Sequence, residues 1–254
     1  MLKGYQFLRS IELNKNSIRS FNTYPFCLPA VKTLSNLELH PKVTFIVGEN
    51  GTGKSTILEA IAASYGFNPE GGTINFNFSS KATHSELYNY IKLIRGVVRP
   101  KDGFFLRAES FYNVATNVDE LNKEDMNRGG RQLYSSYGGI SLHNQSHGES
   151  FFSLIMNRFG SDGLYILDEP EAALSPARQM AMVSRIHYLV QKRCQFIIAT
   201  HSPIIMSYPD STIYEIKDYI RKVNYKDTEN YQVMKTFVNN TDKMLDILMN
   251  TELD

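Results

Sequence analysis

Apolar runs and amphipathic stretches alternate along the chain and predict strands and helices in turn. Residues 43–47, 164–167 and 196–199 are runs of aliphatic, β-branched and aromatic side chains, which is the pattern of buried strands. Residues 55–63 and 176–193 have helical spacing, and the second stretch has an apolar face of Met180, Val183, Ile186, Leu189 and Val190. Because near-continuous apolar strands alternate with helices, the predicted fold class is α/β, with a parallel sheet covered by helices.

The rest of the chain has weaker patterns. Residues 104–106 predict another buried strand and residues 73–78 a half-exposed one, whereas residues 87–94 fit a strand or a helix equally well. Residues 122–147 lack periodicity and are interpreted mostly as loop, and residues 228–250 predict two amphipathic helices. Near the N-terminus, two groups predict a flanking antiparallel β layer: Phe7, Ile11 and Leu13, then Tyr24, Phe26 and Leu28.

Composition narrows the class of protein. The 254 residues are 42% hydrophobic and 21% charged, which suffices for a sizeable core and excludes wholesale disorder. With 27 basic and 26 acidic side chains, the net charge of +1 favours neither nucleic acid nor an anionic membrane, although a local basic stripe is compatible with it. The sequence shows no apolar run near the roughly 20 residues that span a bilayer and no secretory signal. We therefore expect one cytoplasmic domain over residues 1–254, in which Cys27 and Cys194 are free thiols.

The segment between the first predicted strand and its helix contains the most specific motif. Its sequence, G-E-N-G-T-G-K-S, fits the phosphate-binding pattern G-x-x-x-x-G-K-[ST] at every constrained position. Glycines let backbone N–H groups converge on phosphate oxygens, the lysine places a charge between the β- and γ-phosphates, and the serine hydroxyl ligates Mg²⁺. The sequence thus predicts that a nucleoside triphosphate is bound by Gly48, Glu49, Asn50, Gly51, Thr52, Gly53, Lys54, Ser55 and Thr56.

An acidic pair follows the second predicted strand. Asp168 and Glu169 come directly after residues 164–167, at the carboxyl end of a buried strand, where parallel sheets bind ligands. At that position Asp168 can hold Mg²⁺ through water, with Ser55 as a further ligand, and Glu169 can polarise the attacking water. The pair predicts hydrolysis of the bound triphosphate.

Two further segments fit the same site. Ser146, Gly148 and Glu149 lie just before a predicted helix over residues 150–159, and a serine and a glycine at a helix N-terminus form an anion-binding end. The same residues also fit a capping box, with Ser146 as the cap and Glu149 three positions later. His201 follows the third predicted strand, from which it can reach a γ-phosphate.

In their order and spacing these motifs resemble the ABC ATPase superfamily. The resemblance covers the whole chain, is densest over residues 43–60 and 144–204, and points to the soluble, non-transporter branch of SMC and DNA-repair heads and small bacterial ATPases. It implies ATP and Mg²⁺ as ligands, His201 as a switch histidine, and a reduced helical subdomain over about residues 111–160.

The resemblance also implies a homodimer in the ATP state. Ser146, Gly148 and Glu149 of one subunit would face the γ-phosphate that Lys54 of a second subunit holds, so that ATP joins two chains head to tail. Only about 36 residues separate Glu109 from Ser146, too few for the coiled coil of SMC proteins, so the chain resembles a head without arms.

The chain departs from the superfamily pattern at the lid. The usual glutamine after the strand at residues 104–106 is absent, and Glu109 is the best substitute for it as a magnesium-sensing residue. The aromatic side chain that stacks on adenine could be Phe21, Tyr24 or Phe26.

The sequence therefore predicts Mg²⁺-dependent hydrolysis of ATP to ADP and phosphate, coupled to dimerisation, with Glu169 and His201 as catalytic residues. One alternative is an ATP-gated module with negligible turnover that controls a partner protein, such as a nuclease or a toxin. Another is an ATP-dependent DNA-binding head, which net charge does not support. A small-molecule kinase shares the phosphate-binding motif, but an Asp-Glu pair followed by His201 about 30 residues later argues against it.

Overall fold

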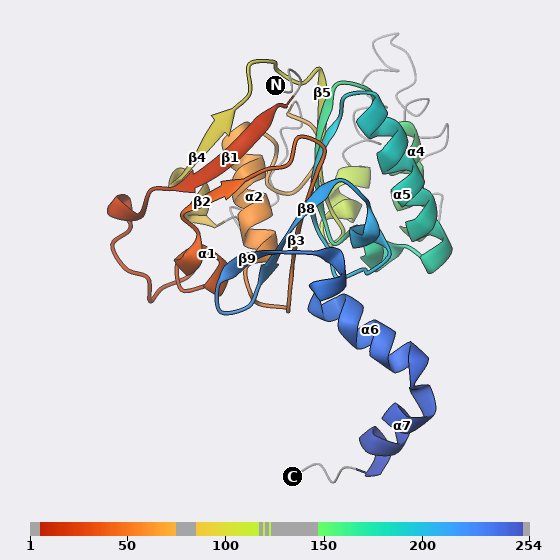
Figure 1. The fold of residues 1–254 in the computed structure, drawn as a ribbon. Helices are drawn as coiled ribbons and strands as arrows, with labels where there is room; N and C mark the ends of the chain where they lie inside the picture. The colour runs from red at the N-terminus through yellow and green to blue at the C-terminus, as the bar shows by residue number, and fades with distance from the viewer. Residues whose placement is uncertain (1–5, 75–84, 117–118, 120–121, 123–146, 251–254) are drawn as a thin grey trace.

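The computed structural model describes residues 6–74, 85–116, 119, 122 and 147–250, and in these the strands form a six-stranded and a three-stranded sheet (Figure 1). The order across the larger sheet is β5 (Asp102–Arg107), β6 (Gly163–Asp168), β7 (Gln195–Ala199), β3 (Val43–Gly48), β8 (Ser211–Ile216) and β9 (Ile220–Val223). Its neighbouring strands pair in parallel, except that β9 runs antiparallel to β8. The predicted parallel sheet is therefore confirmed.

The central strands are apolar because both of their faces are covered. Every residue of β3, β6 and β7 is buried, which explains why the sequence shows continuous rather than alternating apolar runs. The register pairs Ile46 of β3 with Ala199 of β7, and Ala199 in turn with Asp168 of β6. The carboxyl ends of three strands thus meet at one edge of the sheet.

A helix that begins just after β3 lies between the two sheets. Helix α2 (Lys54–Tyr65) buries Ile57, Leu58 and Ile61 in one cluster with residues of both sheets, among them Ile46 and Ile11. Burial on opposite sides explains why apolar residues are not confined to one narrow stripe of this helix. Helix α2 is consequently held on two sides, directly after the segment with the phosphate-binding pattern, which is called the P-loop below.

The smaller sheet confirms the predicted antiparallel β layer but not both of its predicted strands. β1 (Leu8–Leu13) pairs antiparallel with β2 (Asn36–Glu38) and β4 (Ile91–Arg95). The strand predicted over residues 24–28 is wrong, because this segment forms turns that lead into α1 (Pro29–Thr33). Pro25 and Pro29 offer no N–H to a neighbouring strand. Phe26 is instead a buried core residue, and its ring lies edge-on to that of Tyr90 with 4.8 Å between the ring centroids.

A buried amide joins the two sheets. The side-chain oxygen of Gln195 accepts hydrogen bonds from the backbone N–H groups of Phe7 at 3.0 Å and Leu8 at 2.9 Å. Its side-chain nitrogen donates to the backbone oxygens of Leu8 at 2.7 Å and His40 at 3.0 Å. The first residue of β7 therefore holds the start of β1.

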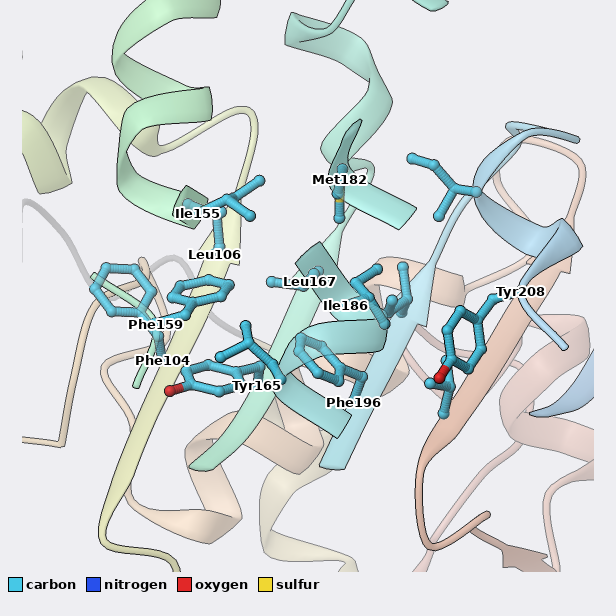
Figure 2. Close-up of a cluster of buried hydrophobic side chains, with 14 of the residues drawn as sticks. Phe104, Leu106, Ile155, Phe159, Tyr165, Leu167, Met182, Ile186, Phe196 and Tyr208 are labelled. Atoms are coloured by element: carbon cyan, nitrogen blue, oxygen red, sulfur yellow. The ribbon is translucent and has the colours of Figure 1, made fainter. Parts of the chain in front are cut away.

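Helices α4 (His147–Asn157) and α5 (Pro176–Gln191) cover the other face of the larger sheet. Their apolar side chains pack with those of β5, β6 and β7 in the cluster shown in Figure 2, where Phe159 stacks on Tyr165 at 4.2 Å. The predicted face of α5 is wrong at Met180, which is 58% exposed, whereas Met182 is buried. Residue 182 precedes Ile186 by four positions, close to one helical turn, so the two side chains share a face of the helix. Residue 180 precedes Ile186 by six positions and therefore points about 120° away from it around the helix axis.

The C-terminal segment forms the two predicted helices, α6 (Glu229–Asn239) and α7 (Thr241–Asn250), which lead away from the sheets (Figure 1). None of their residues is buried. Where the chain is described, no helix combines the length and the apolar character needed to cross a bilayer.

The remaining predictions have mixed outcomes. Residues 87–94 contain both a 3-10 turn (Glu86–Asn89) and β4, while residues 73 and 74 are not part of a strand and residues 75–78 lie outside the described part. Within the predicted helical subdomain, residues 111–116 and α4 are helical. Ser146 and almost all of the predicted loop over residues 122–147 lie outside the described residues. Cys27 and Cys194 are both free, as expected.

Candidate nucleotide-binding site

The loop between β3 and α2 has the geometry of a phosphate-binding loop. Gly53 has a left-handed backbone with φ of +101°, which favours glycine just where the chain enters the helix. The ammonium of Lys54 donates to the backbone oxygens of Gly48 and Glu49, each at 2.9 Å, and so folds back over the loop. Burial lowers the pKa of Lys54, while the nearby carboxylates of Glu169 and Asp168 act in the opposite direction.

A cavity of about 220 Å³ opens over this loop. Most of its lining comes from the P-loop and the first turn of α2, with Glu169 from the end of β6 and two residues from the segment before α1. The lining residues are Tyr24, Leu28, Asn50, Gly51, Gly53, Lys54, Ser55, Thr56 and Glu169. The structure thus brings together residues of the P-loop and the acidic pair that are more than 110 positions apart.

Ser55 and Asp168 face one another at the start of α2. The Ser55 hydroxyl donates to Oδ1 of Asp168 at 3.0 Å. Burial raises the pKa of Asp168 to about 6, although the Arg107 guanidinium and the hydrogen bond from Ser55 both lower it. Among the described residues, no group of three or more His, Cys, Asp or Glu side chains could hold a metal ion by itself. A hydroxyl and one carboxylate nevertheless suit Mg²⁺, which keeps several waters and takes other ligands from phosphates.

Glu169 has an unusual backbone. Its φ of +50° and ψ of +51° place a non-glycine residue in the left-handed region, which is costly and is often found at functional sites. Its Oε1 lies 3.5 Å from Nε2 of His201, so the two predicted catalytic side chains are adjacent. Strand pairing explains the proximity, since β6 and β7 end side by side.

Glu171 was missed by the sequence analysis. One of its carboxylate oxygens accepts a hydrogen bond from the Thr200 hydroxyl at 2.8 Å, and the other accepts from the backbone N–H of His201. The carboxylate therefore fixes the segment after β7 that carries His201. The available signal was its position two residues after Glu169, within the acidic run that follows β6.

The lid position contains two charged residues rather than one. The side chain of Glu109, the predicted magnesium-sensing residue, is 87% exposed and lies 3.4 Å from Nη2 of Arg107. Arg107 was missed, although its Nε lies 3.6 Å from Oδ2 of Asp168, one of the predicted metal ligands. The predicted strand ended at residue 106, whereas β5 continues to Arg107, which the register pairs with Asp168.

Gly148 and Glu149, two of the three residues expected to face the nucleotide of a second copy, lie at the start of α4. A Cβ at Gly148 would lie 2.6 Å from the backbone oxygen of Ala173, so the close approach of two segments requires glycine there. Oε1 of Glu149 lies 3.7 Å from Nη2 of Arg178 on α5. Neither Gly148 nor Glu149 lines the cavity over the P-loop of the same chain.

The structure distinguishes the three candidate adenine-stacking residues. Tyr24 lines the cavity and is 63% exposed. Phe26 is buried against Tyr90, and Phe21 is partly buried against the core cluster around α2. Tyr24 is therefore the candidate with a free aromatic surface at the site.

A P-loop between a buried strand and a helix, beside an acidic pair that ends a neighbouring parallel strand, defines the class of P-loop nucleotide-binding proteins. The chain belongs to the AAA domain family, whose sequence model matches residues 15–251. A relative from Caldanaerobacter subterraneus subsp. tengcongensis, described as an ABC transporter ATP-binding protein, is 27% identical over 197 residues, 71% of this chain and 79% of the relative. These two findings confirm the resemblance to ABC-type ATPases.

Solved structures that align with most of this chain include the following two. The SMC head domain from Thermotoga maritima is 18% identical, with 85% of this chain and 98% of that one covered and a TM-score of 0.41. CbiO1 from Clostridium perfringens, described as part of the ABC transporter complex cbiONQ, is also 18% identical, with 97% and 100% covered and a TM-score of 0.49.

Proposed function

We propose that this chain binds ATP with Mg²⁺ and hydrolyses it to ADP and phosphate. The observation that carries the proposal is the 3.0 Å contact between the Ser55 hydroxyl and Asp168, directly beside the P-loop and one residue before Glu169. An oxygen pair for the metal, a phosphate-binding loop and a carboxylate for the attacking water are the parts that phosphoryl transfer to water requires.

Each role follows from position. Lys54 and the backbone N–H groups of the loop hold the β- and γ-phosphates, for which Lys54 exchanges its present contacts with Gly48 and Glu49. Ser55 and Asp168 would hold Mg²⁺, which neutralises charge on the phosphate oxygens. Glu169 accepts a proton as the water oxygen bonds to the γ-phosphorus and the bond to the β–γ bridging oxygen breaks. His201, whose Nε2 lies 3.5 Å from Oε1 of Glu169, would contact the γ-phosphate.

We further propose that ATP joins two copies head to tail, with Ser146, Gly148 and Glu149 of one copy over the nucleotide of the other. This follows from the resemblance, and it agrees with the finding that neither Gly148 nor Glu149 lines the cavity of its own chain. The cycle would act on a partner protein through this change of state.

Light scattering with ATP and Mg²⁺ tests the dimer in the non-hydrolysing Glu169→Gln background. We expect the mass to double with ATP but not with ADP. Adding Ser146→Arg should keep the protein monomeric and leave ATP affinity within about twofold, because Ser146 acts on the other copy's nucleotide. A protein that remains monomeric in ATP without Ser146→Arg, or a dimer that survives it, would contradict the head-to-tail arrangement.

Tyr24 is expected to stack on adenine. Replacing it with Leu should weaken ATP binding about 5- to 150-fold, since stacking of a base on an aromatic ring contributes about 1–3 kcal/mol. Phe21→Leu serves as the matched control and should leave the affinity unchanged, because Phe21 packs against the core. Calorimetric titration with ATP and with inorganic triphosphate provides the measurement. An equal loss for triphosphate would show that Tyr24 does not act through the base.

A second function, an ATP-gated module with negligible turnover, is favoured by the lid. An exposed Glu109 bonded to Arg107 replaces the usual glutamine, so the lid lacks the amide that orients water in the superfamily. Steady-state phosphate release separates the two functions: turnover abolished by Glu169→Gln supports hydrolysis, whereas ATP-driven dimerisation without turnover supports the gated module.

A further inference from the structure

We propose that Arg107 is a positioning residue for the magnesium site. Its guanidinium contacts both Asp168 and Glu59 of α2, and in this way it holds the Asp168 carboxylate opposite Ser55. The inference rests on the proposed function, since it assigns the metal to Ser55 and Asp168. It goes further by naming a side chain that touches neither nucleotide nor metal.

Arg107 bridges the sheet and the P-loop helix. Its Nη1 donates to Oε2 of Glu59 at 2.8 Å, and its Nε lies 3.6 Å from Oδ2 of Asp168. Glu59 is itself fixed, because its other oxygen accepts a hydrogen bond from the backbone N–H of Ser85 at 2.8 Å. The Arg107 and Glu59 side chains are only 18% and 11% exposed.

These contacts close a ring. Ser55 and Glu59 are four positions apart on α2 and therefore share one face of the helix. From Ser55 the ring runs to Asp168 of β6, then to Arg107 of β5, and through Glu59 back to α2. The pairing of β5 with β6 places Arg107 next to Asp168, and one turn of α2 places Glu59 next to Ser55. Asp168 is thus held from two directions.

The geometry around Asp168 leaves a place for a ligand. The hydrogen bond from Ser55 goes to Oδ1, whereas Nε of Arg107 is 3.6 Å from Oδ2 and makes no hydrogen bond to any described residue. At this distance the guanidinium balances the buried charge without using the lone pairs of Oδ2, which can still accept from metal-bound water. A planar guanidinium can face both carboxylates at once, which a lysine ammonium does less well.

A second ion pair at the other end of β5 offers a matched control. Arg158 forms an ion pair with Asp102, the first residue of β5, at 2.9 Å, and both side chains are 21% exposed. This ion pair is comparable in burial to that of Arg107 but lies at the opposite end of the strand. Its loss should affect stability without reaching the metal site.

The test is the gain in ATP affinity that Mg²⁺ gives, measured by calorimetry with Mg²⁺ and with EDTA. In Arg107→Gln we expect this gain to fall about 10- to 100-fold, the usual effect of removing a residue that orients a metal ligand, with metal-free affinity unchanged. Arg107→Lys should recover part of it. Arg158→Gln should lower the melting temperature and leave the gain unchanged.

Different outcomes would overturn the positioning role of Arg107 and the proposed function. A normal Mg²⁺ gain in Arg107→Gln, or an equal loss in Arg158→Gln, would overturn the positioning role and leave the proposed function standing. A wild-type protein that binds ATP no better with Mg²⁺ than with EDTA would overturn the proposed function itself. If Arg107→Gln does not fold, Glu59→Gln breaks the same ring, and an undiminished gain in that variant would overturn the inference.

Discussion

Replacing Glu169 with Gln lowers ATP hydrolysis about 10²- to 10⁴-fold in our expectation, which is the usual contribution of a positioned general base. The amide has nearly the same shape and can still orient water, but it cannot accept the proton. The groups proposed to hold the phosphates belong to the P-loop, whereas Glu169 lines the cavity from the end of β6 and is assigned to the attacking water. The affinity of the Glu169→Gln protein for ATP should therefore stay within about twofold of wild type. Single-turnover phosphate release and a calorimetric titration of ATP measure the two quantities separately.

Glu12→Gln is the control for this change. It makes the same substitution on β1, where Glu12 lies 3.8 Å from Lys92 and is 44% exposed, and turnover should be unaffected. A Glu169→Gln protein that hydrolyses ATP within about threefold of wild type would show that another group takes the proton. The adjacent His201 would then be the first residue to examine.

Replacing Lys54 with Ala is expected to weaken ATP binding about 10- to 100-fold. A charged hydrogen bond to phosphate contributes about 1.5–3 kcal/mol, and no other described lysine lines the cavity to replace it. The loss should be smaller for AMP, which lacks the β- and γ-phosphates that the ammonium reaches. Calorimetry with ATP, ADP and AMP provides the comparison.

Lys42→Ala is the matched control for the lysine. Lys42 immediately precedes β3, so it lies at the opposite end of the same strand, where its ammonium pairs with Asp210. Its removal should leave the affinities for all three nucleotides unchanged. Equal affinity of wild type and Lys54→Ala for ATP would contradict the proposed phosphate-binding role.

Local sequence patterns were sufficient for the parallel sheet and the P-loop. Buried strands such as β6 are continuous apolar runs, and the spacing of the P-loop motif is set by backbone geometry within a few residues. The same reasoning gave a wrong strand over residues 24–28. Phe26 packs against Tyr90 from a turn, and it is not part of an alternating strand. Periodicity alone does not distinguish these two origins of burial.

The contacts that organise the candidate site were not predictable in the same way. Arg107 matters because β5 and β6 pair in a particular register, and because one turn of α2 brings Glu59 to it. Glu171 matters because it reaches residues almost thirty positions later, at the end of β7. Such contacts depend on three elements being assembled at once, and no single window of sequence contains them.

The amide of Gln195 couples the nucleotide site to the N-terminus. Its hydrogen bonds hold Phe7 and Leu8 at the first residue of β7, and the same strand ends just before His201. Detaching β1 would leave the buried side-chain oxygen of Gln195 without its donors and its side-chain nitrogen without the Leu8 acceptor, at a cost of about 1–3 kcal/mol for each unsatisfied group. We therefore expect heat to melt the smaller and the larger sheet in one cooperative transition, with no partly unfolded form in which the edge that carries the candidate site survives alone.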